Sequence, residues 1–310
     1  MKQLLKKKVC GISIAWFYGL ALLSLVGIIA GSFADKSISM SLYDKNNGYG
    51  LFFESFGTAL GYMMVPAGAT CVFLGLREYK KWWVTTLRFI LLLGASLAAG
   101  YIYGGSLYEG KEEYGLLVSK LPAFGFSFFM MGLAILLTYM FVDKIESRSL
   151  IIVGTVILLA MIFQLVLLNF FLKYLAGRPR WRYLEGDALD SNGVNESFRA
   201  WWEMQPFKYR HGDYHKSWPS GHTATAAIVT LLPLLGIVAE KKHKYMSAAF
   251  FAFGACYTLV VAFARIVAGA HFLSDVSFGC FFSLCGIILS LHFGDFLNKK
   301  LFSNHEKKEQ

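Results

Sequence analysis

Eight long runs of apolar residues constrain this chain more than any other feature of its sequence. They cover residues 11–31, 51–76, 82–107, 116–142, 150–172, 223–239, 245–264 and 272–293. A helix needs about 20 apolar residues to cross the hydrocarbon core of a bilayer, and every run except the 17-residue sixth reaches that length. Of the 310 residues, 56% are hydrophobic and 16% are charged. The sequence therefore predicts an all-α protein, a polytopic membrane helical bundle with about eight transmembrane helices.

The basic residues between the runs predict the orientation of the chain. If the N-terminus is cytoplasmic, sixteen lysines and arginines fall in cytoplasmic segments and thirteen on the opposite side. Nine of these thirteen lie in residues 173–218 or at Arg265, so the contrast is decisive only if those nine have another role. The other outer loops combine four lysines with acids such as Asp35 and Glu54, as an external surface does. We expect a multi-pass plasma-membrane protein with cytoplasmic N- and C-termini.

The same features argue against several kinds of ligand. A net charge of +10 is explained by the loops of a membrane protein, so we expect no nucleic-acid partner. The five cysteines lie in or beside apolar runs and lack metal-type spacing with a histidine, which favours a packing role. His211 and His215 flank Asp213 without a cysteine or a helical pattern nearby. We therefore expect no metal and no cofactor, and the sequence leaves the oligomeric state open.

Three polar motifs lie at the ends of the last four runs. The first follows the fifth run, the second precedes the sixth, and the third joins the seventh to the eighth. Counting the crossings places all three at one face of the membrane, whichever face that is. The motif residues are Lys173, Arg178 and Arg180; Pro219, Ser220, Gly221 and His222; and Arg265, His271 and Asp275. Ser220 is also placed to cap the sixth helix.

These residue types together favour phosphate chemistry. Clustered arginines and helix N-termini neutralise a tetrahedral phosphate through bidentate hydrogen bonds and oriented N–H groups. Of two histidines, one can attack phosphorus while the other protonates the leaving alkoxide. His271 and Asp275 are four residues apart, so on a helix they share one face and the carboxylate can hold the imidazole. The alternative is an interfacial cluster of snorkelling cations, although the outer side is unusual for such an excess.

The three motifs resemble those of the type 2 phosphatidic acid phosphatase (PAP2) superfamily, which includes bacterial membrane lipid phosphatases and the vanadium haloperoxidases. Its motifs read K-x6-R-P, P-S-G-H and S-R-x5-H-x3-D. This chain has the same spacings and types, except that Trp181 replaces the proline of the first motif and Ala264 the serine of the third. Neither change removes a charged or proton-transferring group, so the resemblance implies an active enzyme.

The resemblance also implies a role for each motif residue. His271 would be the nucleophile that forms a phosphohistidine, and Asp275 its partner. His222 would act first as the general acid and then as the base that activates water. The phosphoryl oxygens would be bound by Lys173, Arg180, Ser220, Gly221 and Arg265, with Arg178 as an additional, supporting cation.

The family core has six helices, whereas this chain has eight runs. We therefore expect residues 1–81 to be an N-terminal transmembrane hairpin of two added spans, and residues 82–298 to be the PAP2-like six-helix core. That core includes an external loop, residues 181–218, whose many aromatic residues predict that it lies along the headgroup layer or covers a site. Residues 299–310 would form a cytoplasmic tail.

We expect an integral membrane phosphatase whose partners are the bilayer and a membrane lipid phosphate or pyrophosphate, with the active site on the external face. Polyprenyl pyrophosphate, phosphatidate and phosphatidylglycerol phosphate fit equally well. The sequence leaves two alternatives open. One is a non-enzymatic lipid-phosphate binder or transporter, and the other is a vanadate-dependent, haloperoxidase-like enzyme.

Overall fold

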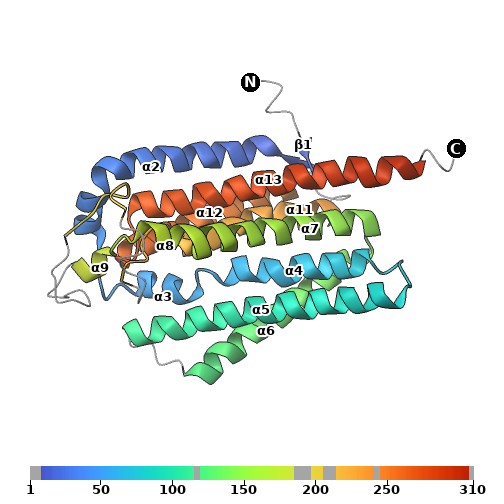
Figure 1. Ribbon diagram of the computed structural model, residues 1–310, viewed down its shortest axis with the longest axis horizontal. Helices are drawn as coiled ribbons and strands as arrows, with labels where there is room; N and C mark the ends of the chain where they lie inside the picture. The colour runs from blue at the N-terminus through green and yellow to red at the C-terminus, as the bar shows by residue number, and fades with distance from the viewer. Residues whose placement is uncertain (1–7, 115–118, 185–196, 205–213, 240–244, 307–310) are drawn as a thin grey trace.

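The computed structural model describes residues 8–114, 119–184, 197–204, 214–239 and 245–306, which form a bundle of long helices (Figure 1). A short hairpin, β1 (Lys8–Val9) and β2 (Ile12–Ser13), precedes the helices. The helices are α2 (Ile14–Leu42), α3 (Gly48–Phe56), α4 (Ala59–Gly75), α5 (Trp82–Tyr114), α6 (Lys120–Val142), α7 (Ser147–Gln164), the π-helix η1 (Leu165–Leu172), α8 (Lys173–Ala176), α9 (Trp181–Leu184), α10 (Gly221–Ala227), the 3-10 helix η2 (Ile228–Leu231), α11 (Leu232–Ala239), α12 (Met246–Val267) and α13 (Leu273–Glu306).

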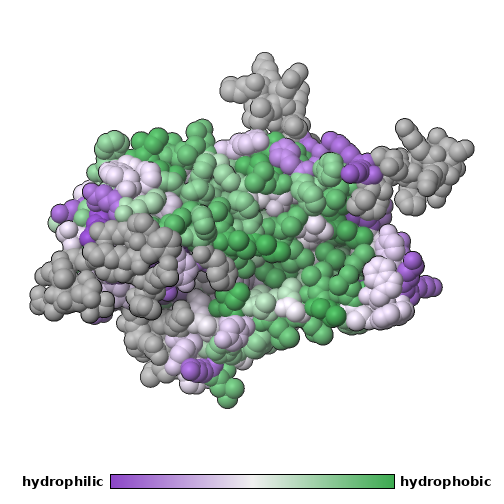
Figure 2. Space-filling model, viewed as in Figure 1, coloured by the Kyte–Doolittle hydropathy of each residue, from purple (hydrophilic) through white to green (hydrophobic). Residues whose placement is uncertain are grey.

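The predicted fold class is confirmed. Among the described residues, seven segments are long and apolar enough to cross a membrane, and the shorter apolar helix Gly221–Gly236 corresponds to the sixth run. Figure 2 shows an apolar surface across the middle of the bundle and polar residues at both of its ends. This is the surface expected of a multi-pass membrane protein whose helices contact lipid.

The short sixth span is interrupted because of Pro233. A proline ring clashes with the carbonyl four residues earlier, here that of Val229, and cannot donate a hydrogen bond. The chain responds with the tight turn of η2 between α10 and α11. Because a 3-10 turn rises by about 2 Å per residue, α10, η2 and α11 together extend about 30 Å, enough to cross the hydrocarbon core.

The first helix is longer than its apolar run. The run ends at residue 31, but α2 continues to Leu42 and carries Asp35 within it. Asp35 is 3% exposed, and Glu54, also predicted to lie on an external surface, is buried in α3. The prediction that these two acids lie on an external surface was wrong, because each carboxylate is paired with an arginine inside the bundle. A charged residue therefore did not mark the end of the membrane-spanning helix α2.

The helices that carry the motifs lie between the first two spans. In Figure 1, α2, α13, α7 and α4 follow one another across the bundle, with α5 and α6 beyond α4. The main neighbour of α2 is α13, and that of α4 is α7. The two spans of residues 1–81 thus pack mainly against different helices, α13 and α7, and the N-terminal hairpin expected for these residues stays a prediction. The boundaries drawn for the catalytic core, residues 82–298, stay a prediction.

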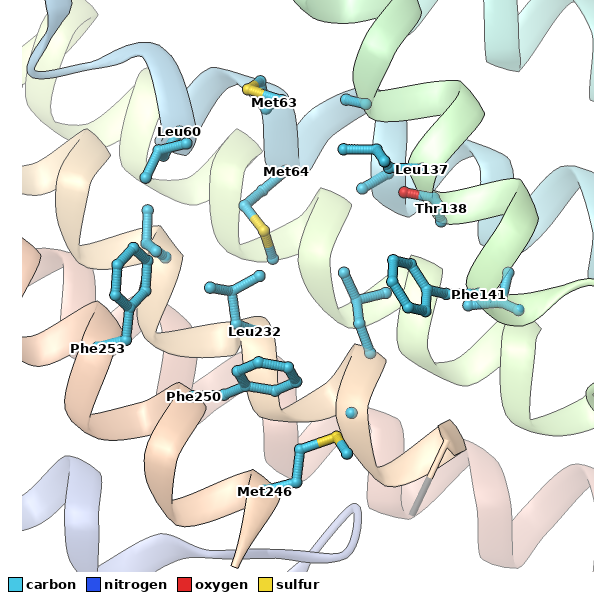
Figure 3. A pocket seen from close by; sticks show the side chains of 16 residues that line it. Leu60, Met63, Met64, Leu137, Thr138, Phe141, Leu232, Met246, Phe250 and Phe253 are labelled. Atoms are coloured by element: carbon cyan, nitrogen blue, oxygen red, sulfur yellow. The ribbon is translucent and has the colours of Figure 1, made fainter. Parts of the chain in front are cut away.

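An apolar cavity of about 360 Å³ lies between α4, α6, α11 and α12, lined by side chains such as Met64, Phe141 and Phe250 (Figure 3). Toward the end of the bundle that carries the motifs, α4 and α10 approach closely. A Cβ atom built on Gly61 would lie 2.2 Å from the carbonyl oxygen of Thr225. Glycine is therefore needed at this contact between α4 and α10.

Candidate active site

Main-chain hydrogen bonds bring the three motifs together at one end of the bundle. Ser217 N donates to Arg178 O at 3.0 Å, and Ser220 N donates to Asp275 O at 3.0 Å. The amide of Arg182, just after the first motif, donates to Gly269 O of the third at 2.9 Å. Residues from three separate connections are thus held in one buried cluster.

His271 lies in the turn between α12 and α13 and is 1% exposed. Its Nδ1 atom is 2.5 Å from the main-chain carbonyl oxygen of Ser217. A carbonyl only accepts, so Nδ1 carries the proton and Nε2 keeps a free lone pair. Burial, together with the positive charges of Arg180, Arg265 and Lys173, holds the pKa of His271 well below its ordinary value. The ring is therefore neutral at neutral pH and available as a nucleophile through Nε2.

Asp275 does not hold His271 directly, contrary to the expectation from their spacing. The helix α13 begins only at Leu273, so the two residues do not share a helical face. Asp275 Oδ2 instead accepts hydrogen bonds from Ser217 Oγ at 2.5 Å and from the amide of Phe272 at 2.9 Å. The carboxylate acts on His271 through Ser217, whose carbonyl oxygen bonds the imidazole.

The nitrogens of Arg178, predicted to be a supporting phosphate ligand, all donate to groups within the protein. Its Nη1 donates to Asp275 Oδ1 at 2.5 Å and its Nη2 to Asp35 Oδ2 at 2.9 Å. Its Nε donates to the carbonyl oxygen of Arg199, and the ring of Phe272 lies 4.0 Å from the guanidinium carbon. Arg178 thus uses all three nitrogens within the protein and clamps α2 to the start of α13. These contacts fit a residue that supports the site from within the protein, as a supporting cation would.

Arg265 and Glu54 form the second buried ion pair of the cluster. Arg265, 1% exposed, donates from Nη2 to Glu54 Oε1 at 2.9 Å. Arg182 donates from Nη1 to both carboxylate oxygens of Glu54, at 3.1 and 3.2 Å. The Nε and Nη1 atoms of Arg265 are buried without a hydrogen-bond partner among the described residues. Buried donors of this kind are costly unless an acceptor binds them, which fits a site for phosphoryl oxygens.

The second motif supplies a capped helix start and a histidine. Ser220 caps α10, as predicted, with its side chain accepting from Thr223 N at 3.4 Å. His222 Nε2 lies 3.0 Å from the main-chain carbonyl oxygen of Glu54, so this nitrogen carries a proton. A Cβ atom built on Gly221 would lie 3.4 Å from Lys173 Nζ. That is an ordinary contact distance, and the close approach that requires glycine is to Asn169 Oδ1 of η1, 2.9 Å from the same position.

Part of the loop 181–218 covers this cluster. Phe198 packs edge-on against Phe272, with ring centroids 5.3 Å apart, and Trp201 Nε1 donates to Ser32 Oγ of α2 at 2.9 Å. These contacts agree with the covering role expected from its aromatic residues. His211 and Asp213 lie outside the described residues, and His215 is buried beside the ring of Tyr214.

Four residues of the cluster had no assigned role in the sequence: Asp35, Glu54, Arg182 and Ser217. The first two are acids near the ends of apolar runs, and this placement was the one sequence feature that could have indicated a role for them. Arg182 and Ser217 directly flank the first and second motifs, but their contacts depend on the fold. No group of three or more potential metal-ligating side chains occurs in the part of the chain that the structure describes.

Comparison with known proteins supports the interpretation of the motifs. Residues 149–299 match the model of the PAP2 superfamily, and this region contains all three motifs. No curated protein and no solved structure matches the chain.

Proposed function

We propose that this protein, which contains a PAP2 superfamily domain in residues 149–299, is an integral membrane phosphatase. Its substrate is a lipid phosphate or pyrophosphate of the polyprenyl pyrophosphate, phosphatidate or phosphatidylglycerol phosphate type. The reaction proceeds through a phosphohistidine on His271 at the external face of the plasma membrane. His222 and Asp275 assist the reaction, and Lys173, Arg180, Ser220, Gly221 and Arg265 bind the phosphoryl group.

The observation that carries this proposal is the hydrogen bond of His271. Its Nδ1 donates to Ser217 O, which leaves the Nε2 lone pair for attack in a buried, positively charged setting. A neutral imidazole with a fixed tautomer is what a nucleophilic histidine requires. A histidine that only packed in the bundle would not need cations around it.

In the first step, Nε2 of His271 attacks phosphorus. A P–N bond forms while the bond between phosphorus and the leaving oxygen breaks. His222, as the imidazolium, delivers the proton on its Nε2, the nitrogen that donates to Glu54 O in this structure, to that leaving oxygen and becomes a neutral imidazole. The developing charge on the phosphoryl oxygens is neutralised by Arg265 and by the other cations of the cluster.

In the second step, water replaces the histidine. His222, now lacking that proton, takes one from the water molecule as its oxygen attacks phosphorus. The P–N bond breaks, inorganic phosphate is released, and both histidines return to their starting state. Arginine and lysine supply the positive charge at the phosphoryl oxygens in both steps, so we expect no requirement for a metal ion.

The position of the cluster supports a lipid substrate. The motifs lie at the end of helices long and apolar enough to cross a bilayer, so we expect a phosphate bound there to lie near the level of the lipid headgroups. A lipid can present its phosphate at that level while its chain stays in the hydrocarbon.

The test is phosphate release from a panel of lipid phosphates by the purified chain in lipid nanodiscs with EDTA. We expect release by the wild type and loss of release in His271→Ala, which should elute like the wild type on gel filtration. His292→Ala, on the half of α13 away from the motifs, is the matched control and should keep full activity. Turnover by His271→Ala at the wild-type rate would refute the mechanism. Binding of a lipid phosphate without any release would instead favour the binder or transporter.

A further inference from the structure

We propose that Glu54 is a positioning residue of this active site, a role that rests on the proposed function. Its carboxylate fixes the guanidinium of Arg265, and its main-chain carbonyl fixes the proton on His222. Glu54 belongs to α3, which lies outside the three motifs and outside residues 149–299.

The carboxylate of Glu54 holds two arginines at once. Arg265 Nη2 lies 2.9 Å from Oε1, and Arg182 Nη1 lies 3.1 and 3.2 Å from the two oxygens. Glu54 is 6% exposed, so water screens these interactions weakly. Without the carboxylate, two buried guanidinium groups would repel each other and would have no fixed separation.

Arg265 is anchored at one nitrogen and open at the others. Its Nη2 is bound to Glu54, while Nε and Nη1 lack hydrogen-bond partners among the described residues. A guanidinium group is planar, so a bond that fixes one nitrogen also restricts the directions of the other two. Glu54 thus aims the two unpartnered nitrogens at the place where phosphoryl oxygens would bind.

The main chain of Glu54 acts on the proposed acid. His222 Nε2 donates to the carbonyl oxygen of Glu54 at 3.0 Å, which keeps the proton on the nitrogen that must deliver it. One residue therefore contacts both the phosphate-binding arginine and the proton donor.

The helix that carries Glu54 is itself held in place. Asn47 caps its start by accepting from the amides of Tyr49 and Gly50. Tyr49 Oη donates to Val260 O at 2.6 Å, and Tyr257 Oη donates to Gly57 O at 3.1 Å, where the chain turns from α3 into α4. These bonds tie both ends of α3 to α12, the helix that carries Arg265, so Glu54 and Arg265 keep a fixed separation.

A competing role for the same carboxylate is that of a counter-ion which substrate must displace. The two roles predict opposite effects of removing its charge. A counter-ion would compete with phosphate, so its removal would lower KM. A positioning residue would be needed in the transition state, so its removal would lower kcat. The simultaneous contact with His222, which acts on the leaving oxygen and not on the phosphoryl oxygens that Arg265 binds, favours positioning.

The experiment compares Glu54→Gln, Glu54→Asp and the wild type in nanodiscs. Glu54→Gln keeps the main-chain contact with His222 and removes the charge. We expect kcat/KM to fall by about 100-fold, mostly in kcat, because the guanidinium of Arg265 loses its fixed direction. Glu54→Asp keeps a carboxylate and should recover about tenfold of the loss. Glu146→Gln, exposed and directly before α7, is the matched control and should turn over like the wild type.

Inhibition by orthovanadate, a mimic of the five-coordinate transition state, separates positioning from a folding defect. For a positioning residue, the vanadate inhibition constant of Glu54→Gln rises about as much as kcat/KM falls. A purely structural residue would leave fewer active molecules with an unchanged inhibition constant, which contradicts the proposal. A lower KM with unchanged kcat, or equal losses in Glu54→Gln and Glu54→Asp, also overturns it.

The outcome remains informative if the wild type releases no phosphate. In that case the proposed function fails, and calorimetric titration with orthovanadate still tests the positioning of Arg265. We then expect about tenfold weaker vanadate binding by Glu54→Gln than by the wild type. Equal binding by the two proteins would refute the role of Glu54 by itself.

Discussion

Replacing Arg178 by alanine tests whether this residue is a clamp within the protein or a ligand of the substrate. The structure gives it contacts to Asp35 and Asp275 at 2.9 and 2.5 Å, and all three side chains are at most 3% exposed. Arg178→Ala leaves two buried carboxylates without this cation. We therefore expect a large loss of stability, whereas a phosphate ligand would mainly affect KM.

The size of the loss follows from the partners that remain. Breaking a buried ion pair costs about 3–5 kcal/mol when one charge is left behind. Asp275 keeps hydrogen bonds from Ser217 Oγ and Phe272 N, and Asp35 keeps those from Ser274, so the lower end of that range applies. A loss of about 3 kcal/mol shifts the unfolding equilibrium by about 150-fold.

The assay is equilibrium unfolding in mixed micelles, followed by tryptophan fluorescence. The double variant Arg178→Met with Asp35→Asn should recover part of the loss, because one uncompensated carboxylate is removed together with the arginine. Wild-type stability of Arg178→Ala together with a raised KM would refute the clamp and restore the phosphate-binding role predicted from the sequence.

Four further predictions concern the surroundings of His271 and the second motif. Ser217→Ala removes the hydroxyl bond to the buried Asp275 but keeps the carbonyl that bonds His271, so kcat should fall about tenfold and the free energy of unfolding by about 1–3 kcal/mol; steady-state kinetics and a melting curve check both. Gly221→Ala places a Cβ atom 2.9 Å from Asn169 Oδ1 and 3.4 Å from Lys173 Nζ, so kcat/KM should fall about tenfold. The control is Gly19→Ala, where the added atom meets nothing within 4 Å. Because the pKa of His271 is lowered in the folded protein, the acid limb of kcat/KM should lie below the ordinary histidine value of about 6.5, once the ionisation of the substrate is measured separately by phosphorus NMR. The same shift means that the unfolded chain binds more protons as the pH falls through about 6.5, so stability should decrease in that direction.

The fold could be predicted because lipid imposes a simple rule on the sequence. Each span must satisfy its own main-chain hydrogen bonds, so apolar length alone identifies helices. Apolar length did not predict where the first helix ends, because α2 continues past the apolar run 11–31 and includes Asp35. A buried carboxylate paired with an arginine 143 residues away cannot be told from an exposed one by local sequence.

The candidate site could be predicted as a set of residues but not as a set of contacts. The order of the motifs along the spans is enough to place His222, His271 and Arg265 at one face of the membrane. The partner of His271 was assigned wrongly, because the start of α13 at Leu273 decides whether residues 271 and 275 share a face. The role of Glu54 could not be predicted for a related reason, since its contacts join helices far apart in the sequence.

The central claim is that His271 becomes covalently phosphorylated during turnover. The most direct measurement is a quench in base of the enzyme turning over a lipid labelled with radioactive phosphorus, followed by peptide mapping. Phosphohistidine survives base, so the account predicts acid-labile label on the peptide that contains His271, and none in His271→Ala. Label on a different residue, or phosphate release by the wild type without any covalent label, would contradict it.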